Sequence, residues 1–104
     1  MRELNLIDTI TRINSFVNHF NKFTHSKGYL ATWELRYDDE EKPILFKFYI
    51  TLDDTFALGY EVSIEAIKLL YDPYLTISDE FNLMVLKLAN AKHIQRDIAE
   101  RNGD

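Results

Sequence analysis

The sequence contains no cysteine and only three glycines among its 104 residues, and these shortages exclude several kinds of site. Without cysteine there is no disulfide, no thiolate zinc site and no cysteine nucleophile. Phosphate-binding loops need closely spaced glycines so that backbone N–H groups can reach the phosphate oxygens. Gly28, Gly59 and Gly103 lie far apart in the chain. The sequence therefore excludes the nucleotide-loop enzymes.

Long apolar runs are also missing. No stretch approaches the roughly 18 apolar residues that cross a membrane. Residues 1–5 carry a charge pair, and neither the apolar centre nor the cleavage site of a signal peptide follows them. We therefore expect a cytoplasmic protein that makes no contact with membranes.

The titratable residues do not form a recognisable catalytic or metal-binding pattern. His19 and His25 are six residues apart, which on a helix turns them about 240° from each other. His93 and Asp97 are one helical turn apart, a spacing more typical of a surface ion pair than of a metal site. No serine can be matched with a base and an orienting acid. We expect no enzyme activity, no metal site and no cofactor.

Hydrophobic residues make up 46% of the chain, which is enough for a packed core. A chain of this length buries roughly two thirds of its unfolded surface. No linker or internal repeat divides it, so residues 1–104 are predicted to form a single domain.

Apolar and polar residues alternate with a period of two in three consecutive runs between residues 29 and 62, which predicts three half-buried strands. Short acidic breaks at residues 38–43 and 53–54 join the runs, so an antiparallel meander is expected. The second break is expected to form a turn wider than two residues, because Asp-Asp suits a two-residue hairpin poorly. Gly59 is expected to mark a bulge or a close backbone contact. The inward-facing positions are predicted to be Tyr29, Ala31, Trp33, Leu35, Tyr37, Ile44, Phe46, Phe48, Ile50, Leu52, Phe56, Leu58, Tyr60 and Val62.

Helical periodicity appears on both sides of these strands. Residues 5–27 are predicted to form an amphipathic helix with Asn5 as its N-cap. A short helix is expected after Ser63 and should end at residues 72–73, followed by a linking segment at 74–77. Ser78 is then expected to cap the last helix. The buried stripe of that helix is predicted to be Phe81, Met84, Leu88, Ala91, Ile94 and Ile98.

Together these patterns predict an α+β fold of order α-β-β-β-α-α, in which the helices pack on one face of a three-stranded antiparallel meander. Leu83 and Leu86 point away from the buried stripe of the last helix. We expect one of them to be covered by residues 72–77 or by a second subunit, and a homodimer through the last helix is the second of these expectations.

The net charge of −5 is unevenly distributed. Residues 34–80 hold twelve acidic and four basic residues, whereas the remainder holds five acidic and eight basic residues. Such a balance disfavours general nucleic-acid binding, which depends on lysine and arginine. The candidate partner-binding residues lie in the two acidic turns and on the polar sheet face: Asp38, Asp39, Glu40, Glu41, Asp53, Asp54, Glu34 and Glu61. That these acids serve only solubility is the simpler alternative.

We therefore expect a small, non-enzymatic interaction protein or inhibitor. Its acidic surface would mimic DNA and occupy a basic, nucleic-acid-type site on another protein. Small phage-encoded inhibitors, antitoxins, immunity proteins and anti-CRISPR proteins are similar in type, although no shared motif is involved. The alternative is a nucleic-acid-binding regulator that uses basic residues of the first helix (Arg12, Lys22, Lys27) or of the last (Lys87, Lys92, Arg96, Arg101).

Overall fold

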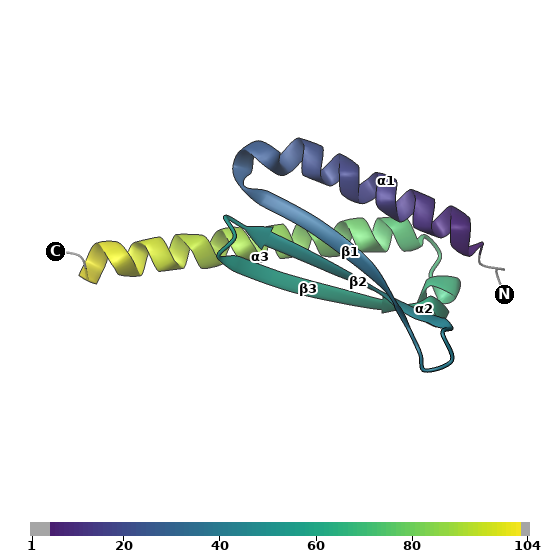
Figure 1. Cartoon of the computed structure of the whole chain (residues 1–104). Helices are drawn as coiled ribbons and strands as arrows, with labels where there is room; N and C mark the ends of the chain where they lie inside the picture. Colours follow the sequence, from purple (N-terminus) through teal and green to yellow (C-terminus); the bar gives the residue numbers. More distant parts are fainter. Residues whose placement is uncertain (1–4, 103–104) are drawn as a thin grey trace.

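A three-stranded antiparallel sheet forms the middle of the molecule, and the two long helices lie on one of its faces (Figure 1). The computed structural model describes residues 5–102, so the expectation that residues 1–5 are no signal peptide concerns a segment mostly outside this range. The strand order β1-β2-β3 and the chain order confirm the predicted α+β fold. The elements are α1 (Leu6–Thr24), the 3-10 turn η1 (His25–Lys27), β1 (Tyr29–Tyr37), β2 (Pro43–Leu52), β3 (Phe56–Ser63), α2 (Ile64–Leu69) and α3 (Pro73–Asn102).

Helix α1 begins and ends at residues whose local chemistry suits those positions. The side chain of Asn5 accepts a hydrogen bond from the backbone N–H of Asp8 at 3.1 Å, which confirms Asn5 as the N-cap. The chain leaves η1 through Gly28, whose φ of 87° lies in the left-handed region that favours glycine. Ile13 and Val17 are fully buried on the inward side of α1. The helix is thus anchored to β1 along its apolar stripe.

The core lies between the inner face of the sheet and the two long helices. Phe46, Phe48 and Ile50 of β2 are completely buried because β2 is the central strand and helices cover its inner side. The ring of Phe81 from α3 lies 5.4 Å from that of Phe48 and 5.0 Å from that of Phe16 in α1. The alternation predicted from the sequence therefore corresponds to the inner and outer faces of the sheet, except at Tyr37 and Ile44. These two residues are 57% and 41% exposed beside the register shift at the end of the β1–β2 pair, so the prediction that they face inward is wrong.

The connection between β2 and β3 is a tight turn with left-handed backbone conformations. Asp53 has a φ of 55° and Asp54 a φ of 57°, conformations that aspartate tolerates better than most residues. The backbone N–H of Thr55 donates to the carbonyl of Leu52 at 3.1 Å. Because Leu52 pairs with Phe56, three residues separate the paired positions, in agreement with the expectation of a turn wider than two residues.

Gly59 does not mark a bulge, so that prediction is wrong. It pairs with Tyr49 in an uninterrupted β2–β3 register. A Cβ atom at Gly59 would lie 3.6 Å from its nearest neighbour, the carbonyl oxygen of Phe48, which is an ordinary contact distance. The register shift in the sheet lies instead between β1 and β2, where Ile44 of β2 is an extra residue between the pairs Arg36–Leu45 and Tyr37–Pro43.

The segment after β3 differs from the sequence prediction. Ser63 caps α2 as expected, but residues 74–77 are not a linker and Ser78 is not a cap. Helix α3 begins at Pro73, and the side chain of Asp72 accepts a hydrogen bond from the N–H of Leu75 at 3.1 Å. Proline suits the first position of a helix because its missing N–H needs no partner there. The Asp-Pro pair therefore starts α3, and only residues 70–72 separate it from the end of α2.

The second half of α3 extends past the end of the sheet (Figure 1). Phe81, Met84 and Leu88 are buried as predicted, whereas Ile94 and Ile98 are 50% and 52% exposed. Their burial was predicted from helical spacing, which continues along α3 although the sheet beneath it has ended. The prediction was wrong for these two residues because spacing does not show how far the supporting layer reaches.

Replacing Phe48 by Ala should lower the free energy of unfolding by about 3–5 kcal/mol, because the side chain is completely buried. Phe23→Ala is the matched control, since Phe23 is 70% exposed and its loss should cost about 0.5 kcal/mol or less. Denaturant titration of both variants measures the difference. Equal losses in the two variants would contradict the assignment of the inner face.

Candidate interaction surfaces

The β1–β2 loop is held in shape by its first acidic residue. One carboxylate oxygen of Asp38 accepts hydrogen bonds from the backbone N–H groups of Glu40 and Lys42, both at 2.9 Å. The N–H of Glu41 donates to the carbonyl of Asp38 at 3.0 Å, and Glu41 has a φ of 62°. Asp38 thus serves the loop itself, as aspartate commonly does in turns.

Among the described residues, the other acidic side chains of this loop have no cationic partner. Asp39, Glu40 and Glu41 are exposed, and their carboxylates make no ion pair within residues 5–102. Beside the loop lies an open pocket of about 450 Å³. Its lining combines apolar and charged residues, namely Leu6, Asp38, Lys42, Pro43, Ile44, Ile64, Glu65 and Lys68. This end of the sheet therefore presents three unpaired carboxylates next to a partly apolar hollow.

Asp53, in the opposite turn, is engaged within the chain. Its carboxylate forms an ion pair with Lys92 of α3 at 2.5 Å, and its N–H donates to the carbonyl of Gly28 at 2.9 Å. A Cβ atom at Gly28 would lie 2.1 Å from a carboxylate oxygen of Asp53, so a larger residue there would displace the Asp53 side chain. Asp53 therefore joins three segments, while the neighbouring Asp54 is exposed.

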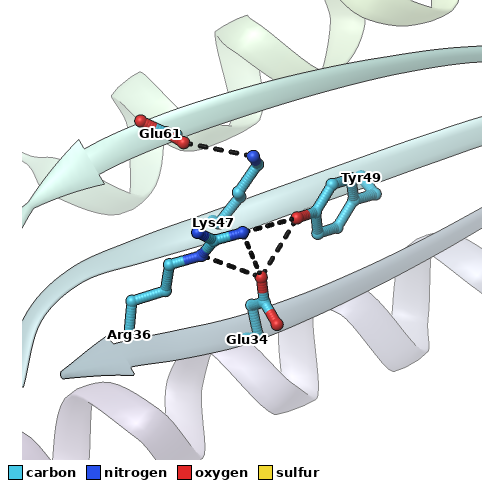
Figure 2. A network of polar contacts seen from close by, with 5 residues as sticks. All are labelled: Glu34, Arg36, Lys47, Tyr49 and Glu61. Carbon is cyan, nitrogen blue, oxygen red and sulfur yellow. Dashed lines mark hydrogen bonds and ion pairs between the residues drawn. The ribbon is translucent and has the colours of Figure 1, made fainter.

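The outer face of the sheet carries a polar network in which acids and bases balance (Figure 2). Glu34 accepts hydrogen bonds from Tyr49 Oη and from Arg36 Nε, both at 3.0 Å. Lys47 forms an ion pair with Glu61 at 3.2 Å, and its ammonium lies 5.1 Å from the centre of the Tyr49 ring. Two of the eight candidate acids thus lie on this face, each beside a base.

The network shifts the titration of its members. The hydrogen bond from Tyr49, followed by that from Arg36, holds the pKa of Glu34 below its ordinary value. Hydrogen bonds that the Lys47 ammonium donates to the Tyr49 and Glu61 side chains raise the pKa of Lys47. Because a lowered pKa stabilises the folded state when the carboxylate is charged, this contribution is present above the unfolded pKa of Glu34. It is lost as the pH falls through the folded value.

Basic residues that are distant in sequence meet on a further surface. Lys27 of η1 and Lys92, His93 and Arg96 of α3 line one pocket of about 360 Å³. Tyr29, Leu52 and Ala89 complete its lining. Among the remaining candidate cations, Arg12 pairs with Asp8 at 3.2 Å and Arg101 with Asp97 at 3.3 Å. The sequence prediction placed these cations on two separate helices and missed His93 and Tyr29. The four-residue spacing of Lys92 and Arg96 was the available signal.

Within residues 5–102, no group of three or more histidine and acidic side chains is placed to hold a metal ion. No helix in the same part of the chain is both long and apolar enough to cross a membrane.

No protein-family model matches the chain, and neither a curated protein nor a solved structure matches it. The functional argument therefore depends on the geometry of these surfaces.

The pKa of Glu34 should rise toward its ordinary value in Tyr49→Phe, because the variant removes the phenol that donates to the carboxylate. Thr32→Ala is the control. Thr32 pairs with Tyr49 on the same face of the sheet, and its side chain forms no hydrogen bond with Glu34 or Arg36. The side-chain carboxyl resonance of Glu34, followed by NMR across acidic pH, measures both. An unchanged titration in Tyr49→Phe would contradict the network.

Proposed function

We propose that this chain is a non-enzymatic interaction protein that binds a basic surface on another protein through the β1–β2 loop. The observation that carries the proposal is the set of three exposed carboxylates at Asp39, Glu40 and Glu41, which form no ion pair within residues 5–102 and lie beside the 450 Å³ pocket. Protein interfaces combine an apolar anchor in a pocket with a charged rim that orients the partner. Both parts are present at this end of the sheet.

The two acidic turns cannot act as one compact surface. They lie at opposite ends of β2, which spans Pro43–Leu52 and is about 30 Å long at 3.3 Å per residue. Asp53 is already paired with Lys92, and Glu34 and Glu61 are balanced by bases on the outer face. The β1–β2 loop is therefore the preferred contact among the eight candidate acids.

A nucleic-acid-type groove is the partner surface that this loop suits best. Such grooves are lined by lysine and arginine that hold phosphates, and a row of carboxylates can occupy the same positions. Complementary charge would also raise the rate of encounter. The proposal therefore includes inhibition by mimicry of DNA, in a cytoplasmic setting, as in small phage-encoded inhibitors, antitoxins, immunity proteins and anti-CRISPR proteins.

Reversing the charge of the loop should slow binding to the partner. The test variant is Asp39→Lys, Glu40→Lys, Glu41→Lys, which spares Asp38 and so keeps the turn intact. After the partner is captured with the parent protein and identified, association rates are measured by surface plasmon resonance at several salt concentrations. We expect the rate at low salt to fall about tenfold or more, and its salt dependence to decrease.

The matched control reverses three exposed acids elsewhere, Asp54→Lys, Asp79→Lys and Glu100→Lys, and changes the net charge by the same amount. It should bind nearly as fast as the parent if the loop is the contact. Equal effects of the two triple variants would show that only net charge matters. An unchanged rate in the loop variant would eliminate the loop as the contact.

The second candidate function is binding of a nucleic acid, favoured by the convergence of Lys27, His93 and Arg96 at one pocket. Phosphate groups are the ligands that such a cluster of cations prefers. In this reading Tyr29, which also lines the pocket, offers a ring for stacking on a base.

Gel-shift assays with duplex and single-stranded probes at low salt test this candidate. Lys27→Glu with Arg96→Glu should weaken binding and reduce the slope of log affinity against log salt by about two. Lys22→Glu with Lys87→Glu, which alters two cations outside this pocket, should leave the slope unchanged. No shift of either probe by the parent protein would eliminate the candidate.

Self-association through α3 remains a proposal. Leu83 and Leu86 are 46% and 68% exposed, so residues 72–77 do not cover them. Of the two expectations from the sequence, burial of Leu83 or Leu86 by a second subunit is the one that is left. The arrangement of β3 and α3 suggests how the two subunits would pack together.

A further inference from the structure

The two edge strands of the sheet differ in whether their outward-facing backbone groups are free to pair with another strand. On the β1 edge, the side chain of Asn21 in α1 bonds both backbone groups of Ala31, donating to its carbonyl at 2.9 Å and accepting from its N–H at 2.7 Å. At the other end of β1, the extra residue Ile44 of β2 shifts the pairing register between Arg36 and Tyr37. Both features are ways in which proteins prevent a further strand from pairing with an edge.

Strand β3 has none of these protections. Its eight residues contain no proline and no lysine, and its register with β2 is regular throughout. Among the described residues, no other element lies beside β3 on the side away from β2 (Figure 1). The small side chain of Ala57 and the lack of a side chain at Gly59 leave the outer face of β3 open to the close approach of another strand. An edge of this length is a template for pairing with another strand.

The helix layer is also uncovered on this side. Helix α3 packs against β2 and β3, while α1 packs against β1. Burial, and then the negative charge of Glu80, raise the pKa of Tyr60, which places Glu80 near the inner side of β3. Leu83 and Lys87 follow Glu80 by three and seven residues, so all three share the side of α3 next to the β3 edge. The exposed Leu83 thus lies along the same side of the molecule as the open strand.

We propose that two copies of this chain pair through their β3 strands, antiparallel about a two-fold axis at Gly59, into one continuous six-stranded sheet. This register places Ala57 opposite Glu61 of the second copy, and Leu58 opposite Tyr60 of the second copy. No like charges face each other, and the half-buried apolar residues of both edges cover one another. A second copy is favoured over an unrelated strand because the edge is complementary to itself about this axis.

The helix layer supports the same symmetry. The two-fold axis brings the α3 helices together antiparallel, and Leu83 lies close to the point where they meet. Glu80 precedes Leu83 by three residues and Lys87 follows it by four, so Glu80 of each copy lies near Lys87 of the other. Within the described residues, neither side chain forms an ion pair in its own chain. The surface involved is separate from the β1–β2 loop, so the dimer does not depend on the proposed function.

Sedimentation equilibrium on the full chain tests the dimer, with two substitutions at one exposed position. Ala57→Glu would place a carboxylate opposite Glu61 of the second copy at two symmetric positions, and should raise the dissociation constant by about fivefold or more. Ala57→Lys would place an opposite charge there and should leave the constant unchanged or lower it. Because Ala57 is exposed on the outer face, neither substitution disturbs the core.

A second pair of variants tests the helix layer. Leu83→Ser should weaken the dimer, whereas Phe23→Ser removes an exposed apolar side chain from α1 and should not. A parent protein that remains monomeric at millimolar concentration would overturn the proposal. So would a dimer that responds equally to Ala57→Glu and Ala57→Lys, or equally to Leu83→Ser and Phe23→Ser.

Discussion

The contact on which the rest of the structure depends is the insertion of Phe81 between α1 and the sheet. Its ring meets those of Phe16 and Phe20 from α1 and that of Phe48 from the central strand, in edge-to-face arrangements at 5.0–5.4 Å. Such pairs contribute beyond the area that they bury. Because Phe81 joins both long helices to the same face of the sheet, the opposite face is left to solvent.

A sheet with one uncovered face must satisfy its outer side chains through neighbouring strands. The pairing register supplies the partners, since Glu34 and Lys47 lie opposite each other, as do Lys47 and Glu61. The result is a network without excess charge, centred on the Tyr49 hydroxyl and ring. The outer face is therefore a poor candidate for charge-driven recognition, even though two of the acids expected to bind a partner lie there.

The eight candidate acids consequently divide into two groups. Asp38 and Asp53 organise the turns in which they lie, and Glu34 and Glu61 balance bases on the sheet. Asp39, Glu40, Glu41 and Asp54 remain without ion pairs in the described part of the chain. A net charge counted along the sequence treats both groups alike. Only the unpaired group creates a field that a partner can sense.

The sequence by itself determined the strands, their antiparallel order, the helix that begins after Asn5 and the inward-facing residues other than Tyr37 and Ile44. These features follow from periodicity and capping, which act between residues close in the chain. The Asp-Pro pair at residues 72–73 was misinterpreted because the same two residues can end one helix or begin the next. The burial of Ile94 and Ile98 was overestimated because periodicity does not show where a sheet ends.

Only the tertiary structure decided which charges are neutralised by ion pairs, which cations share a pocket and which edge of the sheet is open. The Asp53–Lys92 ion pair joins residues 39 positions apart, and the basic pocket joins Lys27 to Arg96. The difference between the protected β1 edge and the open β3 edge depends on where the side chain of Asn21 lies. Contacts of this kind leave no periodic trace in the sequence, because they depend on how separate elements pack and not on the spacing within any one of them.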